Sequence, residues 1–374
     1  MNKTLSLITA LLFSLFAANA QEIKMLVGTY TEGTSAEGVY MYAFNQDTGE
    51  SRFLSMAPSG NPSFVVATPD GKMAYSVNEF NDGRQGVSSY AIRGDFIRRL
   101  DSVTISKEEA DGEDPCNILY TGDAIVTSNY TGGTVTAFFL NSAGRIKDLS
   151  QAISATKEHK LKGLKTGKEK AHMHCAVISP DGKYIFVTNL GNDCIHRFER
   201  GSDGWPLGNS EVIWKSTNIT QQGPRHMVFS PDGRFAYVIC ELSDQLLVFS
   251  YDDGRLKQLQ SPLAYDGHGH GSADIHITPD GRFLYTSHRL SEDGISIFSI
   301  DKETGMVKNT GYKRTGTHPR NFAITPNGRY LLCACRDDNR IEVYDINLAT
   351  GALSLKGEPI QVGAPVCIQF IASN

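Results

Sequence analysis

The chain has 374 residues, of which 40% are hydrophobic and 21% charged, an ordinary composition for a globular protein. Its formal net charge is −5, and this mild acidity excludes the strongly basic surface that nucleic-acid binding or attachment to an anionic membrane requires. Such a length often means two domains, although large all-β folds reach it as one domain.

The N-terminus has the pattern of a secretory signal peptide. Lys3 precedes an apolar run over residues 5–17, and residues 18–20 (Ala-Asn-Ala) form a cleavage site of the A-x-A type. An uncleaved membrane anchor is the alternative, but the apolar run is short for a bilayer span. We therefore expect residues 1–20 to be removed and residues 21–374 to form one exported, periplasmic domain, with no membrane span left after cleavage.

A phrase of five residues, Thr/Ser-Pro-Asp/Asn-Gly-Lys/Arg, recurs along the chain. Proline presets one turn dihedral, and Asp-Gly or Asn-Gly tolerates positive φ, so each copy predicts a tight hairpin turn between two apolar strands. A worn copy at residues 121–123 fills the one double-length gap. The complete copies are residues 68–72, 179–183, 230–234, 278–282 and 325–329.

A second hairpin follows each turn, which gives four strands in every ~50 residues, the period of a β-propeller. Six of these four-stranded units are complete. The seventh is divided between the ends of the chain: residues 25–30, 38–44 and 51–56 supply three strands, and residues 365–370 supply the innermost one. The sequence therefore predicts an all-β, seven-bladed β-propeller closed by pairing of the N- and C-terminal strands. The alternative, an open solenoid, would leave both end strands without a partner.

The repeat also assigns positions to the two faces of the disc. The innermost strand of each blade starts at one face and the next strand returns to it, so the start of the first and the end of the second meet near the axis. The opposite face shows only the repeated turns. Positions at the first face, the mouth of the channel, include Tyr30, Glu79, Asn129, Tyr130, His172, His174, Arg225, His226, Glu241, His276, Arg289, Arg320 and Arg336.

Four arginines in a net acidic chain predict that the mouth binds an anion, such as a carboxylate or phosphate. Glu241 suits a general base or an orienting group. His172 and His174 alternate along an expected strand, so both are predicted on one side of it, and either suits proton transfer.

We therefore predict catalytic roles for His172, His174, Arg225, Glu241 and Arg289. Contacts to substrate are predicted for Tyr30, Asn129, Tyr130, His226, His276 and Arg320. The alternative is structural: Glu241 and the arginines would be ion pairs between blades, and the tyrosines would pack.

Three other features are less specific. His268-Gly269-His270 resembles half of a metal site, but no carboxylate or cysteine completes it, so we expect a loop, no metal and no cofactor. The lysine-rich residues 155–170 suit a solvated surface loop or, alternatively, a lid over the mouth. Most of the seven cysteines are expected to be small buried residues rather than a disulfide framework, although one bridge stays open.

Several motifs, taken together and in order, resemble the seven-bladed propeller lactonase family, which contains the bacterial 6-phosphogluconolactonase of that fold and the fungal carboxy-muconate lactonizing enzyme. The resemblance spans about residues 25–374 and implies a catalytic set of His172 or His174, Arg225, Glu241 and Arg289. Asn189, Asp274 and His288 stand where the family commonly has Asp, Glu and Asn, and these changes line the pocket. The motifs are Gly28-Thr29-Tyr30, Asn61-Pro62-Ser63, Asn129-Tyr130-Thr131-Gly132-Gly133, His172-x-His174, Gly223-Pro224-Arg225-His226, Glu241-Leu242 and His288-Arg289.

We therefore expect a metal-independent lactonase, similar to 6-phosphogluconolactonase, that hydrolyses the ring ester of a small anionic or sugar lactone. No Gly-x-Ser-x-Gly elbow is present, which favours direct attack by water over an acyl-enzyme. One alternative is a cycloisomerase of the muconate type; another is a non-enzymatic propeller that binds a sugar acid or a protein partner. No apolar stripe demands a second copy, so we expect a monomer.

Overall fold

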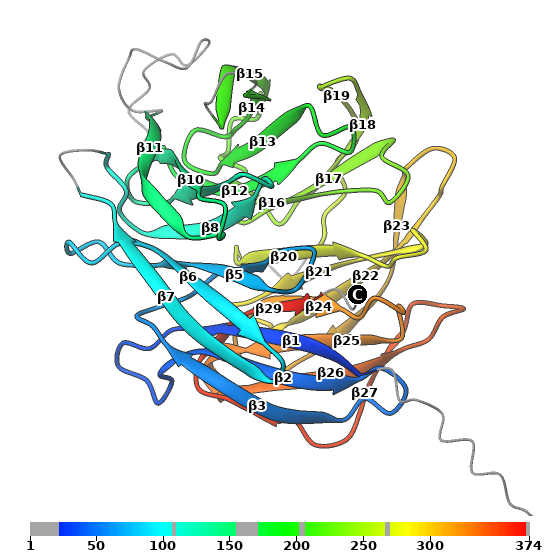
Figure 1. Ribbon diagram of the computed structural model, residues 1–374. Helices are drawn as coiled ribbons and strands as arrows, with labels where there is room; N and C mark the ends of the chain where they lie inside the picture. The colour runs from blue at the N-terminus through cyan, green and yellow to red at the C-terminus, as the bar shows by residue number, and fades with distance from the viewer. Residues whose placement is uncertain (1–21, 107–109, 155–170, 202–205, 266–269, 372–374) are drawn as a thin grey trace, which may run out of the picture.

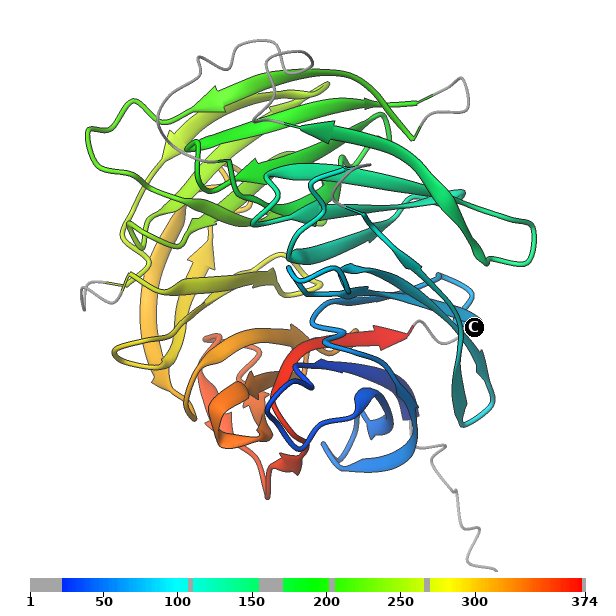
Figure 2. The same cartoon turned by 90° about the vertical axis from the view of Figure 1, so that its left-hand side faces the viewer.

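The structure, a computed structural model, describes residues 22–106, 110–154, 171–201, 206–265 and 270–371. Seven antiparallel sheets are arranged around a central axis, and η1 (Arg336–Asp338) is the only helix among these residues (Figures 1 and 2). The predicted signal peptide, the lysine-rich segment 155–170, and His268 and Gly269 lie outside the described residues, so these predictions stay predictions. In the described ranges, no helix is long and apolar enough to cross a bilayer.

The strands of each blade follow one another from the axis outward. The closing blade contains β29 (Pro365–Ile371), β1 (Glu22–Thr29), β2 (Gly38–Asn45) and β3 (Ser51–Pro58). The first blade contains β4 (Val65–Ala67), β5 (Met73–Asn78), β6 (Gly86–Arg93) and β7 (Phe96–Thr104). The second contains β8 (Pro115–Tyr120), β9 (Ala124–Asn129), β10 (Thr134–Leu140) and β11 (Ile146–Ser154). The third contains β12 (Met173–Ile178), β13 (Tyr184–Asn189), β14 (Cys194–Arg200) and β15 (Leu207–Lys215).

The remaining three blades follow the same order. The fourth contains β16 (Pro224–Phe229), β17 (Phe235–Cys240), β18 (Leu246–Asp252) and β19 (Arg255–Gln260). The fifth contains β20 (Ser272–Ile277), β21 (Phe283–His288), β22 (Gly294–Ile300) and β23 (Val307–Arg314). The sixth contains β24 (Pro319–Ile324), β25 (Tyr330–Cys335), β26 (Arg340–Ile346) and β27 (Leu353–Leu355), and the short β28 (Ile360–Gln361) also pairs with β26.

The two ends of the chain close the ring as predicted. The C-terminal strand β29 pairs antiparallel with β1, with Leu26 opposite Gln369, and the red and blue strands lie side by side in Figure 1. The innermost strands contact one another in the order β4, β8, β12, β16, β20, β24, β29 and back to β4. Because this pairing gives both end strands a partner, the open solenoid is wrong.

The hydrophobic core is divided among the interfaces between blades. Seven clusters of buried residues occur in the described chain, and each draws its side chains from two neighbouring blades. Tyr237 and Ile239 of the fourth blade, for example, pack with Leu284 and Phe298 of the fifth. All seven cysteines are buried with free thiols. Burial of apolar surface between adjacent sheets therefore holds the blades at fixed positions around the axis.

The predicted turns have the expected chemistry. In the fourth blade the Asp232 carboxylate accepts hydrogen bonds from the Ser230 hydroxyl at 2.6 Å and the Arg234 backbone N–H at 3.2 Å. Gly233 has a φ of 73°, a value that favours glycine. These turns lie on one face of the disc, which we call the turn face.

Candidate active site

Two sets of equivalent positions build the mouth of the channel. His174, Arg225 and Arg320 are each the second residue of an innermost strand, in β12, β16 and β24. The strand pairing skips each of them, which marks a β-bulge that turns the side chain out of the regular alternation. The residue directly after the second strand of each blade forms the other set: Tyr30, Glu79, Tyr130, Leu190, Glu241, Arg289 and Arg336.

Glu241 lies between two buried guanidinium groups. Its Oε2 accepts a hydrogen bond from Arg225 Nε at 2.7 Å, and its Oε1 lies 2.9 Å from Arg289 Nη2. Burial raises the pKa of Glu241, but the positive charges of Arg225, Arg289 and Arg320 outweigh it and leave that pKa below its usual value. Glu241 is therefore a carboxylate at neutral pH.

Arg289 is held from three sides. Besides Glu241, its Nε donates to the Gly271 carbonyl at 3.2 Å, and its Nη1 lies 3.3 Å from His318 Nε2. Burial, followed by the charge of nearby Arg225, lowers the pKa of Arg289 to about 9. Arg289 is thus protonated at neutral pH, and its burial makes the charged form less favourable than in an exposed arginine.

A second carboxylate, Glu79, lies at the mouth in a different setting. Tyr30 donates its hydroxyl to Glu79 Oε1 at 2.8 Å, and the Ser63 hydroxyl donates to Oε2. Arg320 Nη2 lies 3.8 Å from Oε1, and its guanidinium lies over the Tyr30 ring. Burial lowers the pKa of Arg320, but its interactions with Tyr30 and Glu79 raise it above the usual arginine value overall. Sequence reasoning assigned no role to Glu79, although it occupies the same register position as Glu241.

The two histidines of the His-x-His motif have different surroundings. His172 Nδ1 lies 2.7 Å from the Tyr130 carbonyl oxygen, and the two rings are stacked with centroids 4.2 Å apart. His174 is buried, and its Nδ1 has no hydrogen-bond partner among the described residues. Burial and the positive charge of Arg225 hold the pKa of His174 well below its usual value, so this imidazole is neutral.

His226 and His276 share a buried carboxylate deeper in the channel. His226 Nδ1 lies 2.7 Å from Asp274 Oδ1, and His276 Nε2 lies 3.0 Å from Oδ2. Burial lowers the pKa of His226 to about 4, against the opposing effect of Asp274. The rings of His226 and His174 meet edge to face, with centroids 5.1 Å apart. Asp274 therefore holds His226 and His276 in place, and His226 in turn packs against His174 at the mouth.

Asn129 does not join the other predicted site residues. It is fully buried, its amide donates to the Thr134 hydroxyl at 2.8 Å, and its carbonyl oxygen accepts from Thr127 at 2.9 Å. These bonds lie within β9 and β10, so the side chain is used inside its blade instead of contacting substrate. Tyr130, which follows it, supplies the mouth-facing group through its stacking on His172.

Metal-binding geometry is absent from the described part of the chain, where no group of three or more His, Cys, Asp or Glu residues could hold an ion. His270, the described member of the His-Gly-His motif, has its Nδ1 2.6 Å from the Leu242 carbonyl oxygen.

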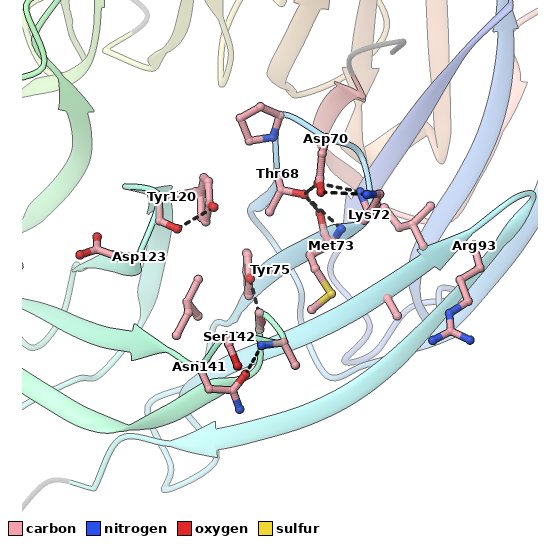
Figure 3. A pocket seen from close by; sticks show the side chains of 17 residues that line it. Thr68, Asp70, Lys72, Met73, Tyr75, Arg93, Tyr120, Asp123, Asn141 and Ser142 are labelled. Carbon is pink, nitrogen blue, oxygen red and sulfur yellow. Dashed lines mark hydrogen bonds and ion pairs between the residues drawn. The ribbon is translucent and has the colours of Figure 1, made fainter.

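A cavity of about 840 Å³ lies on the turn face, between the first and second blades, away from these charges (Figure 3). It opens at a shortened turn: Thr68 N bonds to Met73 O, five residues ahead, whereas Thr121 N bonds to Ala124 O, three ahead. Pro69 of the first blade lines this cavity, whereas the equivalent Pro180 of the third blade packs near Gly233 in the turn of the fourth. The cavity is therefore a local consequence of two missing residues.

Comparison with known proteins agrees with this arrangement. The family described as lactonase, 7-bladed beta-propeller, matches residues 24–370. A 6-phosphogluconolactonase of Formosa agariphila is 34% identical over 92% of this chain and 99% of its own. The solved structure of a Bacteroides fragilis protein is 38% identical, with a TM-score of 0.87 over 95% of this chain and 99% of its own. A periplasmic gluconolactonase of Pseudomonas aeruginosa is 28% identical, with a TM-score of 0.82 over 94% and 99% of the two chains. The chain belongs to the seven-bladed β-propeller lactonase family.

Proposed function

We propose that this protein hydrolyses the ring ester of a gluconolactone-type sugar lactone at the mouth of its channel. The observation that carries the proposal is one ionised carboxylate, Glu241, shared by two buried arginines beside a pair of histidines. The relatives named 6-phosphogluconolactonase and gluconolactonase support a lactone hydrolase over the cycloisomerase and the non-enzymatic binder.

The charges at the mouth suit the reaction. Arg336 is paired with Asp337. Of the other charged groups at the mouth, Arg225, Arg289 and Arg320 formally carry three positive charges and Glu79 and Glu241 two negative ones, which leaves one positive charge. Attack of water on the lactone carbonyl develops one negative charge on the carbonyl oxygen. N–H groups of Arg225 and Arg289 that Glu241 does not use can donate to this oxygen. Glu241 then serves to hold both guanidinium groups in place.

His172 is the better candidate for the base. A carbonyl oxygen only accepts hydrogen bonds, so the contact with Tyr130 requires the proton on His172 Nδ1 and leaves Nε2 as the free acceptor. Nε2 takes a proton from water as the water oxygen bonds to the carbonyl carbon. The bond from that carbon to the ring oxygen then breaks, and the ring oxygen receives the proton, which yields the hydroxy acid. Neutral His174, with its unpartnered Nδ1, hydrogen-bonds the substrate.

A lactone panel with three variants tests these roles. Wild-type protein is assayed on glucono-δ-lactone, 6-phosphogluconolactone and a muconate, with acid release for hydrolysis and loss of ultraviolet absorbance for cyclisation. Glu241→Gln is expected to lower kcat/KM about 100-fold, because both arginines lose their shared anchor. His172→Gln is expected to lower kcat about 100-fold, because no imidazole then takes the proton from water. His174→Gln is expected to raise KM more than it lowers kcat.

Glu303→Gln is the matched control, because Glu303 is exposed in the turn between β22 and β23. Unchanged hydrolysis in Glu241→Gln would remove Glu241 from the mechanism, and an unchanged kcat in His172→Gln would do the same for His172. We also propose that the protein acts as a monomer in the periplasm after loss of residues 1–20. The N-terminal pattern and the periplasmic Pseudomonas aeruginosa relative support this location, and cell fractionation with mass analysis of the N-terminus tests it.

A further inference from the structure

A second cavity opens beside the mouth, between the closing blade and the sixth blade. Its volume is about 660 Å³, within the range of about 300–1,000 Å³ usual for small-molecule sites. The loop after β1 and the segment around η1 form its walls. Tyr30 lines this cavity and also bonds to Glu79 at the mouth, so the two spaces share a wall.

The walls of this cavity are polar but carry little charge that is free for an anion. Thr34 and Ser35 bring hydroxyl groups. Its charged side chains already form ion pairs with groups of opposite charge: Glu32 lies 2.8 Å from Arg84, and Arg336 Nε donates to Asp337 at 2.6 Å. A phosphate would have to compete with Asp337 for Arg336, whereas the hydroxyl groups of a neutral sugar can both donate to carboxylates and accept from guanidinium.

A line of contacts connects this cavity with the candidate catalytic arginine. Asp337 Oδ2 lies 3.4 Å from His318 Nδ1, and His318 Nε2 lies 3.3 Å from Arg289 Nη1. Arg289 in turn contacts Glu241. The cavity wall is therefore fixed relative to the groups that would act on the lactone ring.

We propose that this cavity is a subsite for a neutral sugar unit, so that the protein accepts aldonolactones carrying a glycosyl substituent. The lactone ring lies at the mouth, beside Arg225 and Arg289, and the attached sugar occupies the space beyond Tyr30. This inference rests on the proposed lactonase function, and it adds a substrate class to the same site. A lactone of one sugar unit would leave the cavity unused.

The test compares glucono-δ-lactone with 4-O-glucosyl-glucono-δ-lactone. Wild-type protein is expected to hydrolyse both, with kcat/KM for the glucosylated lactone at least equal to that for the other. Ser35→Trp, which places an indole in the cavity, is expected to lower kcat/KM for the glucosylated lactone at least tenfold and to change that for glucono-δ-lactone less than twofold. Ser142→Trp, in the cavity on the turn face, is the control and should change neither.

The outcomes separate the two proposals. Hydrolysis of glucono-δ-lactone alone by the wild type, or an equal effect of Ser35→Trp on both substrates, would overturn the sugar subsite and leave the lactonase proposal standing. No hydrolysis by the wild type of either lactone or of 6-phosphogluconolactone would overturn both. Should Ser35→Trp fail to fold, Ser35→Gln with competitive inhibition by 4-O-glucosyl-gluconate decides: inhibition no stronger than by gluconate, or unchanged in Ser35→Gln, contradicts the subsite.

Discussion

The two faces of the disc both carry arginine–carboxylate pairs, but the pairs differ in how far apart the partners lie in the sequence and in how deeply they are buried. On the turn face Arg234 lies 2.8 Å from Asp232, two residues away, with side chains 50% and 46% exposed. At the mouth Arg225 lies 2.7 Å from Glu241, which directly follows the neighbouring strand β17, with side chains 2% and 18% exposed. Exposed pairs contribute little to stability, whereas buried pairs carry a large desolvation penalty. Charge at the turn face therefore shapes turns, and charge at the mouth is held where an anionic ligand can offset its cost.

The largest effect is expected where a buried pair is broken. Glu241→Gln leaves Arg225 and Arg289 buried without a counter-charge, because an amide oxygen can accept from one of them while its NH₂ group faces the other. We expect the free energy of unfolding to fall by about 3–5 kcal/mol. Urea unfolding followed by tryptophan fluorescence measures this. A loss below about 1 kcal/mol would mean that the mouth behaves like the exposed pairs of the turn face.

A smaller effect is expected from pH, and it distinguishes two arginines of the mouth. Arg289 has a pKa of about 9 and loses its proton above that pH, whereas the pKa of Arg320 is raised and this group stays charged. Binding of gluconate, the product anion, should therefore weaken about tenfold between pH 8 and pH 10, the factor by which the protonated fraction of Arg289 falls. Isothermal titration calorimetry measures the change. Arg289→Gln should bind weakly at both pH values, and a tenfold change retained in that variant would assign the titration elsewhere.

The repeat register allowed much of this site to be predicted from the sequence. Equivalent positions in successive blades face the same way, so Arg225, Glu241 and Arg289 could be placed together from the repeat alone. Glu79 occupies the same register and was also placed at the mouth, but its residue type alone gave it no role; in the structure it contacts Tyr30, Ser63 and Arg320.

Local geometry that the repeat alone does not give decides the positions of three other side chains. Simple alternation put His172 and His174 on one side of a strand. Both rings do contact the Tyr130 ring, although β12 begins only at Met173 and contains a β-bulge at His174. Asn129 was expected at the mouth because it ends a second strand. The last residue of that strand in fact points into its own sheet, and the next residue, Tyr130, reaches the mouth.

The smallest effect is expected on the turn face, where the chain contains its own control. In the sixth blade Asn327 takes the place of the aspartate, and its side-chain oxygen accepts from the Thr325 hydroxyl at 2.8 Å and the Arg329 backbone N–H at 3.0 Å. Asp232 makes the same two bonds, so Asp232→Asn removes only the exposed charge pair with Arg234. We expect the free energy of unfolding to change by less than about 0.5 kcal/mol and lactone hydrolysis to stay the same. A decrease in the free energy of unfolding as large as that of Glu241→Gln would show that the charges of the turn face also hold the blades together. The two faces would then differ in ligand binding and not in their contribution to stability.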